Sequence, residues 1–132
     1  AQLKKLPSFV EKRRRNAELL TKGLKGTRGL YLPNEPKGCK HSWYLYTARI
    51  QRGDAKVRDG IVEGLRKKGV GATVYYHTPI HKMPYYKQFG SPHLTNTEKI
   101  ARQVFSLPVH PGVTEKDAEY ISESVKQVMR NI

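Results

Sequence analysis

The sequence predicts one α+β domain in which a small, largely antiparallel sheet of about three strands is covered on one face by helices. Helical apolar stripes occur near both ends of the chain and in its middle. Short runs rich in aromatic and β-branched residues lie between these stripes. The 132 residues fit a single domain with a modest core, and the sequence contains no repeats and no internal domain boundary.

The first helix is expected over residues 8–25. Its apolar residues recur at three- and four-residue steps: Leu3, Leu6, Val10, Ala17, Leu20 and Leu24. Proline is tolerated in a first helical turn, so Pro7 predicts that the helix starts near Leu6 or kinks there. Gly23 and Gly26 are expected to end it.

Two strands and a helix are expected in the middle of the chain. Residues 41–50 (HSWYLYTARI) favour a central strand because aromatic and β-branched side chains dominate them. Asp54 is a suitable N-cap for a helix over residues 55–68. Gly69 then closes that helix, and residues 70–76 are expected to form a second strand.

A long loop is predicted over residues 77–94, where proline and glycine interrupt any regular period. Thr95 and Glu98 have the spacing of a capping box, which predicts a helix continuing to about residue 104. Residues 105–107 form a short strand before Pro108. Thr114 and Asp117 repeat the capping pattern and open a terminal helix with the stripe Ala118, Ile121, Val125 and Val128.

The composition restricts the classes of function. Lys and Arg number 25 against 11 Asp and Glu, a net charge of +14, which attracts phosphate-bearing partners. No apolar run reaches the length of a membrane span, so no membrane association is expected. The single Cys39 excludes an internal disulfide and is compatible with a cytoplasmic location.

Few residues qualify for catalysis. His77 and His81 have the spacing of a helical zinc pair, but Pro79 lies between them and the accompanying acid is absent, so no metal site is expected. No lysine is identifiable as a Schiff-base residue. The remaining candidate is the segment 76–81, where two imidazoles and the Tyr76 phenol could deliver protons or hydrogen bonds, unless they are solvated loop residues.

Four stretches, in the right order, resemble the DegT/StrS-type family of nucleotide-sugar aminotransferases. Residues 69–81 (GVGATVYYHTPIH) are similar to the family segment G-I-x-T-x-x-x-Y-x-x-P-[LI]-H. Residues 2–14 are similar to its interdomain helix, and residues 41–46 to its H-x-[WY]-x-x-[YF] strand. Residues 97–110 are similar to its TExxxxxxlsLPlhp segment. Together these stretches span nearly the whole chain.

The resemblance implies that residues 1–132 are the C-terminal small domain of a fold type I enzyme, with residues 1–26 as the helix that joins it to a large domain. Such enzymes are homodimers that use pyridoxal phosphate (PLP) to move an amino group, usually from glutamate, onto a nucleotide-linked keto sugar in amino-sugar and polysaccharide biosynthesis. The resemblance also places Tyr76, Pro79, His81 and His41 near the substrate or cofactor, with His81 in a supporting role. The family's cofactor lysine belongs to the large domain, so this chain alone is expected to bind no PLP and to be inactive.

Two residues depart from the family pattern. Pro7 replaces an acidic or polar residue, and His77 stands where proline is frequent. The alternative hypothesis is that the chain is a stand-alone basic binding or regulatory domain that recognises nucleic acid or another acidic partner. Against it, the cations are spread along the chain and the aromatic residues fall mainly in strands and one loop.

Overall fold

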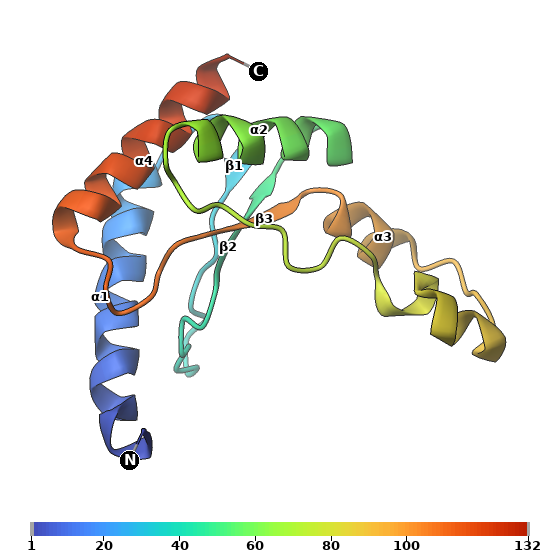
Figure 1. Cartoon of the computed structure of the whole chain (residues 1–132), viewed down its shortest axis with the longest axis horizontal. Coiled ribbons are helices and arrows are strands. Elements are labelled where there is room, and N and C mark those ends of the chain that lie inside the picture. The colour runs from blue at the N-terminus through green and yellow to red at the C-terminus, as the bar shows by residue number, and fades with distance from the viewer. Residues whose placement is uncertain (1, 132) are drawn as a thin grey trace.

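A computed structural model describes residues 2–131 of the chain (Figure 1). Three short 3-10 helices accompany the main elements: η1 (Leu3–Lys5), η2 (Ile80–Lys82) and η3 (Pro84–Phe89). The helices and strands follow in the order α1 (Leu6–Leu24), β1 (Leu30–Tyr31), β2 (Tyr46–Ile50), α2 (Ala55–Lys67), α3 (Thr95–Ala101), β3 (Val104–Leu107) and α4 (Glu115–Arg130).

The three strands form one antiparallel sheet in the order β1-β2-β3. In β2, Tyr46, Ala48 and Ile50 are buried, while the intervening Thr47 and Arg49 are only half-buried. Such alternation shows that one face of the sheet is covered and the other is more open. The predicted α+β class, the antiparallel sheet and the central position of the strand containing Ala48 are therefore confirmed.

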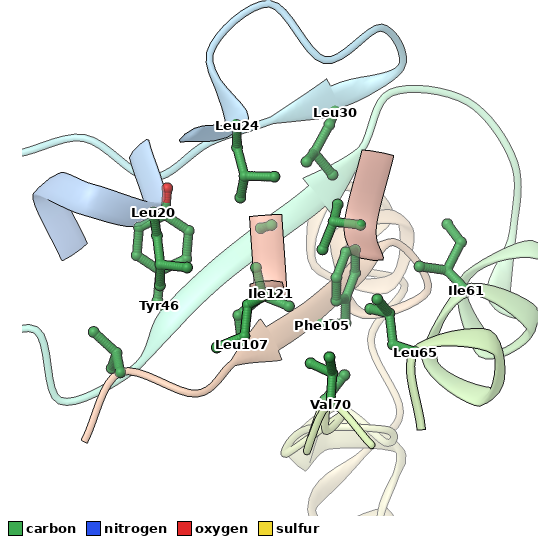
Figure 2. Packing of buried hydrophobic residues seen from close by; sticks show 14 of the residues in the cluster. Leu20, Leu24, Leu30, Tyr46, Ile61, Leu65, Val70, Phe105, Leu107 and Ile121 are labelled. Atoms are coloured by element: carbon green, nitrogen blue, oxygen red, sulfur yellow. The ribbon is translucent and has the colours of Figure 1, made fainter. Parts of the chain in front are cut away.

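Helices α1, α2 and α4 supply the cover, and α4 packs against both of the others (Figure 1). Figure 2 shows their apolar side chains converging on the inner face of the sheet. The core includes Leu20 and Leu24 of α1, Ile61 and Leu65 of α2, Phe105 and Leu107 of β3, and Ile121 of α4. The stripe predicted for α4 is therefore in the core, but only the second half of the stripe predicted for α1 is, since Leu3 and Leu6 are exposed and Val10 is half-buried.

Local capping determines where two helices begin. The Asp54 carboxylate accepts the backbone N–H groups of Lys56 and Val57, at 2.9 and 3.3 Å, and starts α2. Thr114 and Asp117 form a reciprocal capping box at the start of α4. Pro7 lies in the first turn of α1, where it removes no helical hydrogen bond, so the expected start near Leu6 is confirmed.

The strand predicted over residues 41–50 is wrong for its first half. Trp43 has a φ of 51°, in the left-handed region, which interrupts an extended run. Its backbone N–H donates to Nδ1 of His41 at 2.8 Å, and its carbonyl accepts Nη1 of Arg13 at 3.4 Å. The backbone groups of this stretch therefore bond to side chains rather than to a neighbouring strand.

The strand predicted over residues 70–76 is also wrong. Only Thr73 pairs with β3, through two backbone hydrogen bonds with Ser106. The N–H of Val70 is bonded to Leu65 and that of Ala72 to Val70, so the start of the segment is a turn. The third strand is instead β1, two residues long, which the sequence analysis did not predict.

The capping box predicted at Thr95 and Glu98 does not form. Leu94 is the N-cap of α3 and has no side-chain capping hydrogen bond, and the helix ends at Ala101 rather than near residue 104. Glu98 still accepts the backbone N–H of Leu94, but its carboxylate also contacts groups outside the helix. The backbone N–H groups of Arg102 and Gln103 turn back onto the end of α3, which leaves Val104 free to begin β3.

The joining helix expected over residues 1–26 corresponds to η1 and α1, with Ala1 outside the described residues. Among the helices of residues 2–131, none is both long and apolar enough to cross a membrane.

Candidate functional site

Residues 75–101 form an arm that leaves the body of the domain on one side and carries η2, η3 and α3 (Figure 1). No residue of this arm is buried. Most of the large exposed apolar side chains of the domain nevertheless lie on it: Tyr75, Tyr76, Ile80, Met83, Tyr85, Tyr86, Phe89, Leu94 and Ile100. A concentration of exposed apolar side chains is typical of a surface that meets a partner or a ligand.

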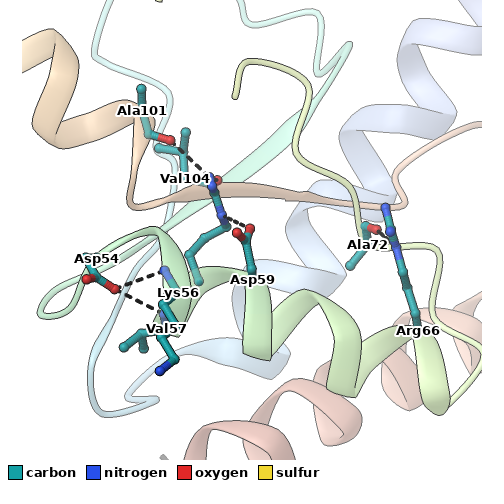
Figure 3. A network of polar contacts seen from close by, with 9 residues as sticks. Asp54, Lys56, Val57, Asp59, Arg66, Ala72, Ala101 and Val104 are labelled. Atoms are coloured by element: carbon teal, nitrogen blue, oxygen red, sulfur yellow. Dashed lines mark hydrogen bonds and ion pairs between the residues drawn. The ribbon is translucent and has the colours of Figure 1, made fainter. Parts of the chain in front are cut away.

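Helix α2 holds both ends of the arm (Figure 3). Nε of Arg66 donates to the carbonyl of Ala72 at 2.9 Å, just before the arm begins. Nη1 of Arg58 donates to the carbonyls of Ala101 and Val104, at 2.9 and 3.1 Å, where the arm returns to the sheet. Because the Arg58 side chain is only 2% exposed, these bonds are shielded from water and fix the position of the arm's ends.

Within the arm, four nitrogen atoms surround the Glu98 carboxylate. Its Oε1 lies 3.2 Å from Nε2 of His81, 3.2 Å from Nδ1 of His93 and 3.3 Å from Nζ of Lys82. It also accepts the backbone N–H of Leu94 at 3.1 Å. One carboxylate of α3 therefore fastens η2 and the 93–94 segment to this helix.

The same contacts set the ionisation of Glu98. The hydrogen bond from His81 is the largest influence, and it lowers the pKa of Glu98 from its ordinary 4.5 to about 2. The Leu94 N–H and the Lys82 ammonium lower this pKa further, while burial opposes them. The carboxylate is thus ionised at neutral pH and is a suitable acceptor for a proton on Nε2 of His81.

The predicted site residues of the arm differ in exposure. Tyr76 is 67% exposed, whereas Pro79 is half-buried and the side chain of His81 is 11% exposed. The His81 ring is therefore oriented by Glu98, whereas the phenol of Tyr76 is exposed to solvent. Both belong to the sequence segment expected to approach a ligand, and that role remains a prediction.

His41 lies in the body, between β1 and β2. Its backbone N–H donates to Oε2 of Glu35 at 2.6 Å, and its carbonyl accepts Nη1 of Arg14 at 2.8 Å. The His41 ring lies 4.4 Å from the Trp43 ring and accepts the Trp43 N–H. Within residues 2–131 no hydrogen bond connects this group to His81, so the structure forms two separate clusters.

A cavity of about 270 Å³ lies between the root of the arm and the segment that follows His41. Arg13, Tyr44, Tyr75 and His110 are among the residues that line it. Nη1 of Arg13 donates to the Tyr44 carbonyl at 3.0 Å, and its guanidinium lies 5.9 Å from the centre of the Tyr44 ring. The hollow therefore combines a cation, an imidazole and two phenols, groups that can bind a polar or anionic ligand.

These lining residues and Glu98 were not selected from the sequence. Tyr44 and Tyr75 occur in the stretches that resemble the family, but their positions alone do not tell a surface phenol from a core one. Glu98 was assigned to a local cap because its distance to His81 depends on how the arm folds back.

The residues present do not fit covalent attachment of PLP. A Schiff-base lysine needs a dry pocket that depresses its pKa. Every lysine in residues 2–131 is exposed or half-buried. No group of three or more His, Cys, Asp or Glu side chains in the described part of the chain could hold a metal ion.

Comparison with known proteins gives a consistent result. A model of the DegT/DnrJ/EryC1/StrS aminotransferase family matches residues 1–126. The chain is 30% identical to the dTDP-3-amino-3,4,6-trideoxy-alpha-D-glucose transaminase of Micromonospora megalomicea subsp. nigra, covering 99% of this chain and 35% of that protein. It is 28% identical to the dTDP-4-dehydro-2,6-dideoxy-D-glucose 3-dehydratase of Saccharopolyspora spinosa, covering 96% of this chain and 28% of that one.

A solved structure agrees with these relatives. The aminotransferase TlmJ from Streptoalloteichus hindustanus superposes with a TM-score of 0.88 and 33% identity, covering 98% of this chain and 34% of TlmJ. The chain thus spans about a third of the length of the proteins it matches.

Proposed function

Because the chain belongs to the DegT/DnrJ/EryC1/StrS aminotransferase family, we propose that it forms the C-terminal small domain of a PLP-dependent aminotransferase that acts on nucleotide-linked keto sugars. In this proposal α1 joins the domain to a large domain outside this chain, and the intact enzyme is a homodimer with glutamate as amino donor. The name of the Micromonospora relative, a transaminase of a dTDP-linked amino sugar, supports the sugar-nucleotide substrate.

The observation that carries the proposal is the arm. It exposes a row of aromatic side chains, yet its two ends are held by the buried Arg58 and by Arg66, and its interior is held by Glu98. A segment that is anchored but uncovered is suited to contact a second body of protein. We propose that this body is the large domain or the partner subunit, and that the arm closes one side of the ligand site.

In that site PLP, when bound, would supply the electron sink for amino transfer. The residues of this chain have supporting roles. Glu98 keeps a proton on Nε2 of His81 and fixes the orientation of the ring, so that Nδ1 is the nitrogen available to accept a hydrogen bond. The exposed Tyr76 phenol can donate to a polar group of the ligand, and Pro79 stiffens the backbone between them.

The proposal is tested on the full product of the gene that encodes this chain. After incubation with PLP, we expect visible cofactor absorbance and glutamate-dependent amination of a nucleotide-linked keto sugar, detected by mass spectrometry. The 132-residue chain, treated in the same way, should acquire no such absorbance. A full product without cofactor absorbance would refute the proposal.

Product mass also decides between two reaction classes in the family, since one relative is named a 3-dehydratase. Transamination replaces a carbonyl oxygen with an amino group, whereas dehydration removes water and adds no nitrogen. A dehydrated product without nitrogen would keep the family assignment but overturn the aminotransferase function.

The proposed site residues require their own comparison. Tyr76→Phe is expected to lower kcat/KM about tenfold or more through loss of one hydrogen bond to the reacting ligand. The matched control is Tyr120→Phe, which removes a phenol from α4 that bonds the Lys68 carbonyl at 2.8 Å. Equal rates for both variants would remove Tyr76 from the site.

A further inference from the structure

A second, larger cavity lies on other elements than the arm. It has a volume of about 810 Å³ and opens where the turn after α1, the end of β2, α2 and the last turns of α4 meet. Its lining contains five cationic side chains and no carboxylate. The cations are Lys25, Arg28, Arg52, Lys126 and Arg130. We call this hollow the cationic cavity.

The positive charge in this cavity is mostly uncompensated. Nζ of Lys126 lies 2.7 Å from Oε1 of Glu123, and this contact, with a weaker contribution from Arg130, lowers the pKa of Glu123. Lys25, Arg28 and Arg52 form no ion pair within residues 2–131. Cations gathered round one hollow raise the local concentration of anions.

The floor of the cationic cavity is apolar. Its accessible apolar side chains are the half-buried Val57 and Met129, whereas Ile50 and Ile61, which also line it, are almost completely buried. An apolar floor beneath a cationic rim favours a ligand that has both an apolar body and negative charge, since each part is then matched.

Backbone geometry shapes the wall of this cavity. Gly26 and Gly29 adopt φ values of 79° and 80°, which turn the chain sharply between α1 and β1. A Cβ at Gly29 would lie 3.3 Å from Cε of Met129, so the turn packs closely against α4. The hollow therefore depends on a defined turn as well as on flexible side chains.

We propose that the cationic cavity binds a small organic anion with at least two phosphate charges attached to a flat ring system, of which a nucleoside diphosphate is a simple example. Arg28 and Arg52 supply planar guanidinium groups that suit phosphate oxygens, and the ring lies on the aliphatic floor. The inference rests on this chain alone and does not use the proposed aminotransferase role.

A nucleic-acid strand fits these observations less well. A strand needs cations that follow the path of its backbone phosphates. The cations of the cationic cavity converge instead on one hollow, which suits a small ligand with few charges.

The test is titration of the 132-residue chain with ADP, UDP, inorganic pyrophosphate and adenosine, followed by calorimetry and by backbone and methyl NMR. ADP and UDP should bind more tightly than pyrophosphate, which lacks the ring, and than adenosine, which lacks the charge. Chemical shifts should change at Gly29, Ile50 and Met129. Binding should weaken with added salt.

Two double variants of equal net charge make the test specific. Arg28→Gln with Arg52→Gln should reduce ADP affinity at least about tenfold, because two charge-assisted contacts are lost. Lys12→Gln with Lys116→Gln removes the same charge from exposed residues outside the cavity and should change affinity less than about twofold. Circular dichroism checks that both variants fold.

Three results would overturn the proposal. Equal loss of affinity in the two double variants would show unspecific attraction to a basic protein. Shift changes confined to the arm would place the ligand elsewhere. Tighter binding of duplex DNA than of ADP, with the same sensitivity to Arg28→Gln and Arg52→Gln, would indicate a nucleic-acid surface.

Discussion

At the scale of single residues, Glu98 connects two sequence motifs that are 17 residues apart. Its Oε1 is hydrogen-bonded to His81 and accepts the Leu94 backbone N–H, and it lies 3.3 Å from Nζ of Lys82 and 3.2 Å from Nδ1 of His93. All of these residues belong to an arm that has no buried residue. An arm without a core of its own depends on polar contacts of this kind for its order.

We therefore expect Glu98→Gln to loosen the arm while leaving the body intact. The neutral amide accepts more weakly from the charged Lys82 and no longer favours the proton on Nε2 of His81. Hydrogen exchange of amides 80–94 should accelerate, and the imidazole ¹⁵N shifts of His81 should show more of the Nδ1-protonated tautomer. Glu63→Gln, which breaks only an exposed pair with Lys67, should do neither.

If the exchange of amides 80–94 were unchanged in Glu98→Gln, the carboxylate would not be the anchor of the arm. A general fall in protection, including amides of β2, would instead show that Glu98 stabilises the whole domain.

The contribution of Glu35 to the stability of the body depends on pH. The pKa of Glu35 is lowered from 4.5 to about 2, mainly by the hydrogen bond from Arg14 and next by the hydrogen bond from the His41 N–H. A folded-state pKa below the unfolded value means that the contribution to stability is complete above about pH 4.5 and is lost as the pH falls towards 2. Trp43 is the only tryptophan, and its ring lies tilted against the His41 ring with the two centroids 4.4 Å apart, so its fluorescence reports this change.

Acid titration should therefore show a change in Trp43 emission between about pH 4.5 and pH 2. In Glu35→Gln this change should be absent, because the amide has no proton to gain in this range. The matched variant Glu63→Gln also removes a carboxylate with a lowered pKa, but from the middle of α2, and should keep the transition. An identical acid transition in Glu35→Gln would show that another group controls the Trp43 environment.

At the scale of secondary structure, the contact between α1 and α4 depends on Gly23. A Cβ placed there would lie 2.5 Å from Oγ and 2.8 Å from Cβ of Ser122. The Ser122 hydroxyl cannot move freely, since it donates to the Ala118 carbonyl at 2.8 Å in the buried interface. The helices can therefore approach this closely only with glycine at position 23.

Gly23→Ala is accordingly expected to reduce the free energy of unfolding by about 1–3 kcal/mol, the usual cost of overpacking. Gly60→Ala is the matched control in α2, where an added Cβ would meet nothing within 4 Å. It should raise the free energy of unfolding by about 0.5–1 kcal/mol, because alanine loses less backbone entropy in a helix. Urea denaturation followed by circular dichroism measures both, and a neutral Gly23→Ala would refute the close contact.

The helices of this domain are more predictable from the sequence than its strands. The helices with apolar stripes or local caps, α1, α2 and α4, were predicted closely because the determining residues lie within a few positions of one another. The strands were predicted less well, since pairing depends on distant partners. Trp43 has strong β propensity yet adopts a left-handed φ because His41 and Arg13 bond its backbone.

At the scale of the whole molecule, the domain consists of a body with a core and an arm without one. The buried residues form one cluster shared by the sheet and the helices α1, α2 and α4. Local opening free energies are lowest where few apolar contacts are buried. The body and the arm should therefore differ in how they open, although both belong to one chain.

Native-state hydrogen exchange in low urea tests this difference. Amides of β2 and α4 should exchange only through global unfolding, with the same free energy that Trp43 fluorescence reports. Amides of η2, η3 and α3 should be protected at least about tenfold less, because they open while the core stays closed. Equal protection in both regions would show that the arm folds together with the body. The same measurement on the full product of the gene tests the proposed role of the arm. There, a large domain or partner subunit that covers the exposed aromatic side chains should suppress the local opening, so the arm should become as protected as β2.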